Sequence, residues 1–315
     1  KLSNFNRDKT INGICRGFFM GGTLKHYFIL NLTVFVWGFT GVLGKEIALP
    51  SDKIVFFRMG IAFTSLLLIG FFYRKKRGVT PKQLAILLAT GMVVGLHWFA
   101  FFESIKLSTV SVGVVCMSSA TLFTAILEPL ILKRPWLLSE FVLSIAIVGG
   151  IILIIGFEPQ YITGIIVGLT AAFFASLFGV LNGKHIRTMP SFQITKYEML
   201  GGFMTMAIIL AGTNALDQNL FIISTRDWGF LLILGLVCTT AAFLISVWLM
   251  KFLTPFTVSM GLNMEPIYAI LIALVLDYSR GESTENMSAG FYAGTCIIIG
   301  AIFINGYMKK KKSRN

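Results

Sequence analysis

A carboxylate, a proline and a tyrosine follow closely on one another inside an otherwise apolar stretch of the chain. They are Glu265, Pro266 and Tyr268. A carboxylate costs at least about 2.5 kcal/mol to insert into hydrocarbon, so it must be neutral, paired or in contact with water. A proline inside a helix removes a backbone hydrogen bond and frees a carbonyl oxygen. The pattern predicts either a site for a substrate amine or a proton beside an interrupted helix, or a protonated glutamate that fixes helix packing.

Two polar faces share this stretch if it forms a regular helix. Gly261, Glu265 and Tyr268 are spaced by four and three residues and lie on one side. Ser259 and Asn263 form a second pair on nearly the opposite side. Only one face can line a cavity unless the proline turns both inward. We favour the face of Glu265 and Tyr268, because it combines a charge with an aromatic surface, and we keep Asn263 as a further candidate.

Other apolar stretches carry side chains that could also line a cavity. His97 could relay a proton, and Phe101 lies four residues further along the same face. Trp37 lies far from any predicted membrane interface, so its indole N–H needs a partner. Ser119 can bond either a substrate or a neighbouring helix. For each of these residues the alternative is an ordinary packing role.

Arg58 is the basic residue that falls within a predicted apolar span, near its outer end. A long basic side chain at such a place can reach the lipid headgroups while its stem stays in the apolar region. We therefore expect Arg58 to pair with Glu46 or Asp52, or to extend to the headgroups, rather than to bind substrate.

The elements that position these residues must lie in a membrane. Of the 315 residues, 56% are hydrophobic and 13% are charged, whereas a typical soluble chain has about 25% charged residues. This composition excludes a soluble protein and a disordered one. The sequence contains no phosphate-binding loop, no metal-ligand set and no hydrolase motif, so it indicates no cofactor and no enzymatic activity.

Ten stretches of the chain are apolar over about 20 residues, the length that crosses a bilayer. They cover 26–48, 54–72, 82–102, 109–132, 139–156, 163–181, 195–213, 228–248, 255–276 and 287–307. The connections between them are short and leave no room for a domain outside the membrane. The predicted fold class is an all-α integral membrane protein with ten transmembrane helices.

The distribution of basic residues predicts an orientation. The chain has 27 Lys and Arg against 14 Asp and Glu, a net charge of +13. The basic residues concentrate before the first span, after the last one and in alternate connections. By the positive-inside rule, both termini then face the cytoplasm of a bacterial inner (plasma) membrane. We expect this charge to meet anionic lipid headgroups and no nucleic acid.

The two halves of the chain resemble each other. Residues 41–47 match 179–186, and the glycine spacing of 150–156 recurs at 300–306. Each half contains an odd number of predicted spans, so the second half must cross the membrane in the opposite sense to the first. Inverted repeats of this kind are a recurring basis for alternating access in secondary transporters. The alternative is an inherited duplication without such a mechanism.

These patterns predict four parts. They are a cytoplasmic segment over 1–25, whose native start could be Met20, a first five-helix repeat over 26–156, a second over 163–307, and a basic cytoplasmic tail over 308–315.

Several segments together resemble a known family. They are Trp37-Gly38, Lys45, Arg58, 99–112, 119–125 and 265–269. This set is similar to the drug/metabolite transporter superfamily, in particular its EamA-type ten-helix members. Two positions differ from the pattern that is frequent in the family. Ala120 stands in place of a proline, and Lys133-Arg134 stand in place of a glycine and a glutamate.

The resemblance implies a secondary transporter that moves a small organic metabolite, such as an amino acid or a related amphipathic compound, often outward. A sugar or nucleotide-sugar carrier of the same superfamily is the first alternative. A membrane-embedded enzyme or scaffold that transports nothing is the second. The implied partners are the lipid bilayer and a small-molecule substrate. Proton coupling through Glu265 and assembly into a homodimer are further hypotheses.

Overall fold

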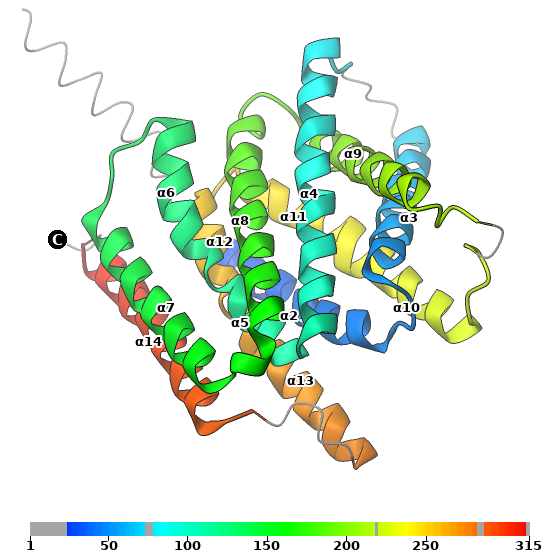
Figure 1. The fold of residues 1–315 in the computed structure, drawn as a ribbon. Helices are drawn as coiled ribbons and strands as arrows, with labels where there is room; N and C mark the ends of the chain where they lie inside the picture. The colour runs from blue at the N-terminus through cyan, green and yellow to red at the C-terminus, as the bar shows by residue number, and fades with distance from the viewer. Residues whose placement is uncertain (1–23, 73–77, 218–219, 282–286, 313–315) are drawn as a thin grey trace, which may run out of the picture.

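The computed structural model describes residues 24–72, 78–217, 220–281 and 287–312, and in this part of the chain all regular elements are helical (Figure 1). In chain order the elements are α2 (Leu24–Glu46), α3 (Ser51–Phe72), α4 (Pro81–Leu107), α5 (Val110–Met117), α6 (Ala120–Leu132), α7 (Leu138–Phe157), the short 3-10 turn η1 (Pro159–Tyr161), α8 (Ile162–His185), α9 (Ser191–Gly212), α10 (Thr225–Gly235), the π-helical turn η2 (Leu236–Ala241), α11 (Ala242–Leu249), α12 (Pro255–Leu262), α13 (Glu265–Arg280) and α14 (Ala289–Lys312).

Eight helical stretches within the described residues are long and apolar enough to cross a membrane. They are Leu24–Glu46, Ser51–Phe72, Pro81–Leu107, Val110–Leu132, Pro159–His185, Ser191–Gly212, Thr225–Leu249 and Pro255–Arg280. Helices α7 and α14 contain the shorter apolar segments Ile145–Phe157 and Ala289–Ala301. The predicted all-helical membrane architecture is confirmed, whereas the count of ten spans and the inversion of the two halves stay predictions. The candidate start at Met20 lies outside the described residues.

Side-chain caps mark several helix starts. At the start of α4, Thr80 and Gln83 form a reciprocal capping box, and Pro81 occupies the first turn. Thr109 caps α5 by accepting a hydrogen bond from the backbone N–H three residues on, and Thr254 caps α12 in the same way. Such caps satisfy backbone donors that would otherwise have no partner at a helix start. They also set where the two interrupted spans begin.

Helices α4, α8 and α9 pack closely on one side of the molecule (Figure 1). A Cβ atom added to Gly91 of α4 would lie 2.2 Å from the Glu198 carbonyl oxygen, and one added to Gly201 of α9 would lie 2.3 Å from the Leu88 carbonyl oxygen. Backbones can approach this closely only where no side chain intervenes. The glycines therefore determine the distance between α4 and α9.

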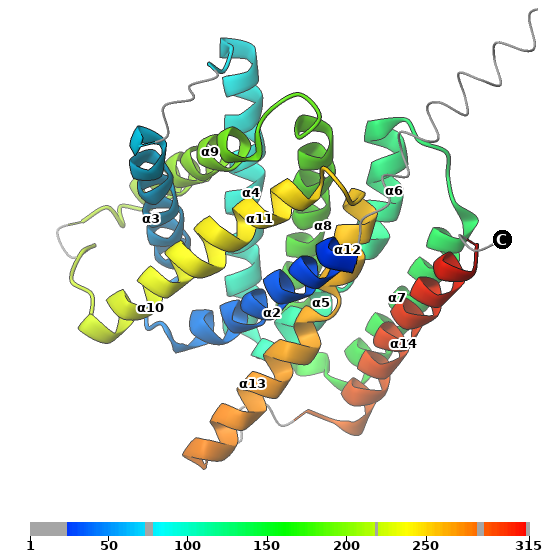
Figure 2. The same ribbon diagram turned by 180° about the vertical axis from the view of Figure 1, so that it is seen from behind.

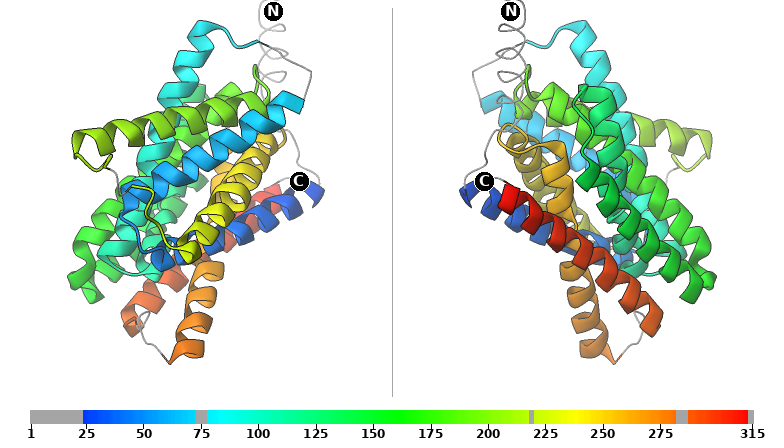
Figure 3. Two further views of the ribbon diagram at one scale, coloured as in Figure 1. Left: turned by 90° about the vertical axis from the view of Figure 1, so that its right-hand side faces the viewer. Right: turned by 90° about the vertical axis from the view of Figure 1, so that its left-hand side faces the viewer.

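On the opposite side, α2 lies between the α10–α11 segment and α13 (Figure 2). The paired helices α7 and α14 run side by side at the edge of the bundle, with Gly150 against the backbone of Gly294. The end of α13 extends beyond its neighbours in both views of Figure 3. Its exposed apolar residues there, including Leu271 and Val275, suit a lipid environment.

Two spans are interrupted at their middles. The first consists of α5 and α6, separated by Ser118 and Ser119. The second consists of α12 and α13, separated by Asn263 and Met264. At both places the backbone N–H groups bond three residues back instead of four, which tightens the turn. The first interruption occurs without the proline that is frequent in the family, since Ala120 stands at that position.

A third span contains a π-helical turn, η2, between α10 and α11. Hydroxyl groups in this turn bond backbone carbonyls five residues back, as for Thr239 to Leu234 (2.7 Å) and Thr240 to Gly235 (2.9 Å). A π-turn leaves a backbone carbonyl without its usual helical partner, and such turns are frequent at functional sites. This turn faces α2 and α3.

A group of polar contacts joins the two halves at one end of the bundle. Glu46, at the end of α2, forms ion pairs with Arg280 of α13 (2.5 Å) and with Arg226 of α10. Lys106 of α4 donates to the carbonyl oxygen of Leu49 in the α2–α3 connection. We call this end of the molecule, defined by Glu46, Arg226, Arg280 and Lys106, the Glu46 end.

Candidate functional site

A cavity lies between the two halves, near the middles of the spans. It encloses about 750 Å³ of space, including its open mouth. Helices α2, α3, α4, α8, α11, α12 and α13, with the break between α5 and α6, contribute to its wall. The lining residues are Trp37, Thr40, Arg58, His97, Trp98, Phe101, Met117, Ala120, Thr124, Ala175, Ser176, Phe178, Gly179, Phe243, Ser246, Met250, Pro255, Val258, Ser259, Leu262 and Glu265.

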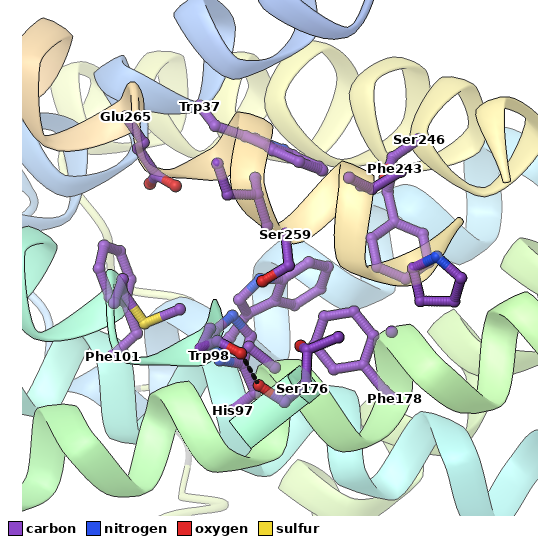
Figure 4. A pocket seen from close by; sticks show the side chains of 18 of the residues that line it. Trp37, His97, Trp98, Phe101, Ser176, Phe178, Phe243, Ser246, Ser259 and Glu265 are labelled. Atoms are coloured by element: carbon purple, nitrogen blue, oxygen red, sulfur yellow. Dashed lines mark hydrogen bonds between the residues drawn. The ribbon is translucent and has the colours of Figure 1, made fainter. Parts of the chain in front are cut away.

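Glu265 lies where α12 gives way to α13 and faces the cavity from the side of Trp37 (Figure 4). It is buried, at 8% exposure, and within the described residues it forms no hydrogen bond and no ion pair. The helix interruption and Pro266 place its carboxylate at a helix start, where backbone N–H groups favour a negative charge. The carboxylate is therefore available to a ligand in the cavity.

Trp37 of α2 is held by the π-turn. Its indole N–H donates to the backbone carbonyl of Cys238 at 2.8 Å. The indole N–H, which needs a partner inside an apolar span, thus finds one in a carbonyl of the irregular turn. The ring itself lies against the cavity. The hydrogen bond fixes the plane of the ring and satisfies its polar end.

The expectation for Arg58 was wrong. Glu46 pairs with Arg226 and Arg280 instead, and Arg58 is buried, at 1% exposure, where it lines the cavity. Its Nε donates to the Thr239 hydroxyl at 2.5 Å, and its guanidinium carbon lies 3.9 Å from the centre of the Trp98 ring. The π-turn and an aromatic face therefore keep this charge inside the protein, because together they replace part of its hydration.

His97 of α4 is buried in the cavity wall. Its Nδ1 lies 2.8 Å from the backbone carbonyl oxygen of Ala171 on α8. A carbonyl only accepts, so this contact assigns the Nδ1 proton to the bond and leaves Nε2 as an acceptor. The rings of Phe101 and Phe178 lie within 6.3 Å and 5.3 Å of the imidazole. The side chain thus both joins two helices and borders the cavity.

The cavity includes four of the seven residues that the sequence suggested, namely Trp37, His97, Phe101 and Glu265. Tyr268 is directed elsewhere, since its hydroxyl donates to Asn31 at 2.8 Å and its Cβ atom packs against Gly38. The remaining two residues lie at the helix interruptions and hold backbone or side-chain partners there. Ser119 donates to the Cys116 carbonyl (2.7 Å), and Asn263 donates to the Thr121 hydroxyl (2.7 Å).

Sequence reasoning missed a second aromatic group in the wall. Trp98, Phe178 and Phe243 line the cavity, and the ring of Phe243 lies within 5.8 Å of each of the other two. Aromatic residues make up 13% of the chain, so residue type alone could not single these out. The same holds for the hydroxyl group of Ser246, whereas Ser259 belongs to the second polar face that the sequence indicated.

A second cavity lies beside the central one, toward the end of the bundle away from Glu46. It shares Met250 and Pro255 with the central cavity. This second cavity is lined also by Glu128, Arg187 and Lys251. Glu128 holds its place by bonding the Phe256 backbone N–H at the start of α12 (2.9 Å) and pairing with Arg134 (3.2 Å). Charged side chains thus lie among mostly apolar ones in a cavity next to the central one.

Comparisons with known proteins agree with this architecture. The model of the EamA-like transporter family matches the chain twice, over residues 24–156 and 162–307. The chain is similar to the Uncharacterized transporter YdfC of Bacillus subtilis (strain 168), with 24% identity over 253 residues, 77% of this chain and 80% of that protein. A protein of known crystal structure shares the fold, with a TM-score of 0.66 and 14% identity over 91% of this chain and 99% of its own.

The two matches of the family model cover most of the chain, and the helical spans agree with a multi-pass membrane protein. Both the family and the Bacillus relative are described as transporters. The resemblance that the sequence suggested is therefore confirmed, and the chain belongs to the EamA-like transporter family of the drug/metabolite transporter superfamily.

Proposed function

We propose that this protein is a secondary transporter that moves a small organic metabolite, an amino acid or a related amphipathic compound, across the bacterial inner membrane by alternating access. The observation that carries the proposal is the central cavity, with Glu265 at a helix interruption and aromatic rings around it. Largely apolar cavities with a few well-placed polar groups are typical small-molecule sites. A carboxylate beside aromatic rings suits a ligand with a positive charge and an apolar body.

Matching positions of the two halves contribute to the cavity, which supports a mechanism built on two related repeats. In the sequence, the second member of each pair follows the first at a nearly constant interval. The pairs are Trp37 and Ala175, Thr40 and Phe178, Trp98 and Phe243, Phe101 and Ser246, Met117 and Leu262, and Ala120 and Glu265.

The helix contacts repeat in the same manner. Helix α5 packs on α13 and α6 on α12, while α3 packs on α9 and α7 on α14. If each helix in these pairs is replaced by its counterpart in the other half, the same set of helix pairs results. Such an exchange would turn a cavity open toward one membrane face into one open toward the other.

The present conformation suits one state of that cycle. The cavity adjoins the second cavity at the Met250 and Pro255 end, where Glu128 also joins the halves through the Phe256 backbone N–H, whereas Glu46 and its ion-pair partners join the halves at the opposite end. In the orientation that the basic residues predict, the Glu46 end is outside and the second cavity is at the cytoplasmic side. This would be a state that loads substrate from the cytoplasm, as export requires.

Transport by purified protein in liposomes tests the proposal. The panel contains amino acids, their amine analogues and, for the alternative carriers, sugars and nucleotide sugars. We expect saturable flux of an amino acid or related compound that an excess of the same unlabelled compound on the opposite side stimulates, because a carrier returns faster when loaded. Flux that does not saturate would indicate a pore, and folded protein without flux of any compound would contradict the proposal.

Glu265→Gln tests the coupling that we assign to this carboxylate. We expect the variant to lose accumulation driven by a proton gradient, because an amide carries no exchangeable charge, and to keep exchange at raised substrate concentration. Glu103→Gln is the matched control, since Glu103 lies on α4 outside the cavity lining. Gradient-driven uptake at the normal rate in Glu265→Gln would remove this residue from the coupling role.

A further inference from the structure

Arg58 has donors that the protein leaves unused. Its Nη1 is buried and has no hydrogen-bond partner in the described part of the chain, and the residue forms no ion pair there. The Nε donor is engaged by the Thr239 hydroxyl at 2.5 Å, and the Trp98 ring covers one face of the guanidinium at 3.9 Å. The direction of the side chain is thus fixed, while its Nη1 donor still has no hydrogen-bond partner among the described residues.

A buried guanidinium with an unsatisfied donor costs free energy, since removing it from water without a partner leaves its charge uncompensated. The guanidinium carries five N–H donors in a planar fork that matches the two oxygens of a carboxylate. Because Arg58 belongs to the cavity lining, an acceptor group in the cavity can supply the missing partner.

The second charge of the same cavity is Glu265, from the other half of the chain. Within the described residues, no ion pair joins Glu265 and Arg58, although their opposite charges attract each other. The first-half residue that corresponds to Glu265 is Ala120, which carries no charge. A doubly negative group such as a phosphate would meet repulsion from Glu265, whereas a ligand with one charge of each sign would satisfy both residues.

We propose that Arg58 binds the carboxylate of the substrate, and that the substrate is an α-amino acid zwitterion whose ammonium group lies toward Glu265 and whose apolar side chain packs on the aromatic wall. This assignment rests on the proposed function and narrows it to one chemical class. It also explains the π-turn, which supplies both the Thr239 hydroxyl for Arg58 and the Cys238 carbonyl for Trp37.

The proposal is tested first on the unaltered protein with three probes that share one side chain. Phenylalanine carries both charges, phenethylamine lacks the carboxylate, and 3-phenylpropionate lacks the ammonium group. We expect phenylalanine to bind about tenfold or more tightly than either analogue, as the loss of one charge-assisted hydrogen bond predicts. Equal binding of phenylalanine and phenethylamine would overturn the role of Arg58.

Variants then identify the residue that makes the protein prefer phenylalanine to phenethylamine. In Arg58→Gln, the affinity for phenylalanine should fall to that for phenethylamine, while the affinity for phenethylamine should not fall. Arg58→Lys should restore part of the preference, because it restores the charge without the planar fork. Lys53→Gln is the control, a basic residue on the same helix as Arg58 but outside the cavity lining, and it should keep the full preference.

The outcomes separate this assignment from the proposed function. Saturable transport of amines or sugars without any preference for a carboxylate would leave the transporter proposal standing and contradict the assignment of Arg58. Retention of the full preference in Arg58→Gln would contradict it as well. If Arg58→Gln does not fold, the three probes on the unaltered protein still decide, since their relative affinities require no variant.

Discussion

At the residue scale, the cavity combines two charges of opposite sign that come from different halves and are held by different means. Arg58 is held by Thr239 and by the face of Trp98. Glu265 lies at the start of α13, where the helix dipole favours a negative charge. Burial makes both charges costly unless a ligand or water completes their surroundings. This cost is the physical reason to regard the pair as a binding device rather than as packing.

Tyr268 provides a test of which face of α13 contacts the substrate. Its hydroxyl bonds Asn31 outside the cavity, so Tyr268→Phe should leave substrate affinity and flux unchanged within about twofold, because an exposed hydrogen bond contributes little. Binding and liposome flux measure this. The paired variant Trp37→Phe, which removes the indole donor to Cys238 within the cavity wall, should weaken binding. A large loss in Tyr268→Phe would return the tyrosine to the site.

At the element scale, irregular turns rather than straight helices build the site. The two interrupted spans meet where Asn263 donates to the Thr121 hydroxyl, next to the breaks between α5 and α6 and between α12 and α13. The π-turn of the third irregular span faces Trp37 and Arg58. Each irregular turn releases carbonyls or donors that a regular helix would consume. The polar groups of the site are therefore largely products of interrupted helices.

Two glycine substitutions on α9 test whether its close packing against α4 limits the stability of the protein. Gly201→Ala places a methyl group where the Leu88 carbonyl oxygen lies 2.3 Å away, so the helices must separate. We expect destabilisation of about 1–3 kcal/mol, measured as a lower midpoint of thermal unfolding in detergent. Gly212→Ala is the matched control, since nothing lies within 4 Å of its added Cβ atom. Equal behaviour of the two variants would show that the contact does not limit stability.

At the scale of the whole molecule, the two ends of the bundle differ. The Glu46 end joins the halves through ion pairs, whereas at the other end the central cavity adjoins a second one and the halves meet through the hydrogen bond of the Phe256 backbone N–H to Glu128. A transporter that alternates must break one set of such contacts and form another. The ion pairs at the Glu46 end are partly exposed, which keeps their contribution small and the closure reversible.

Glu46→Gln tests this closure. Removing the charge weakens the pairs with Arg226 and Arg280, each of which contributes about 0.2–1 kcal/mol, so the population with an open Glu46 end should rise a few-fold. Spin labels introduced at positions 45 and 225, on the two sides of the contact, report the distance between α2 and α10 by electron paramagnetic resonance. Lys82→Gln serves as the control, because it removes an exposed charge at the opposite end of α4. An unchanged distance distribution in Glu46→Gln would show that other contacts hold this end closed.

The sequence by itself determined the class of the protein. Apolar length, scarce charge and short connections require spanning helices, since in a bilayer the backbone must satisfy its own hydrogen bonds. The family resemblance followed from local motifs, and Glu265 was identifiable because a lone carboxylate in an apolar span is costly. Trp37 and His97 followed from the same logic of polar groups in apolar surroundings. All these inferences depend on the solvent and on nearby residues, which a sequence records directly.

Only the tertiary structure decided which polar groups meet. Arg58 and Thr239 are far apart in the chain, and the sequence suggested that Arg58 would pair with Glu46 or Asp52, or extend to the headgroups. The direction of Tyr268 and the aromatic wall of Phe178 and Phe243 were equally undetermined, because a helical repeat defines a face but not the neighbour it meets. A buried charge takes the partner that packing brings to it, and that partner is a property of the assembled bundle.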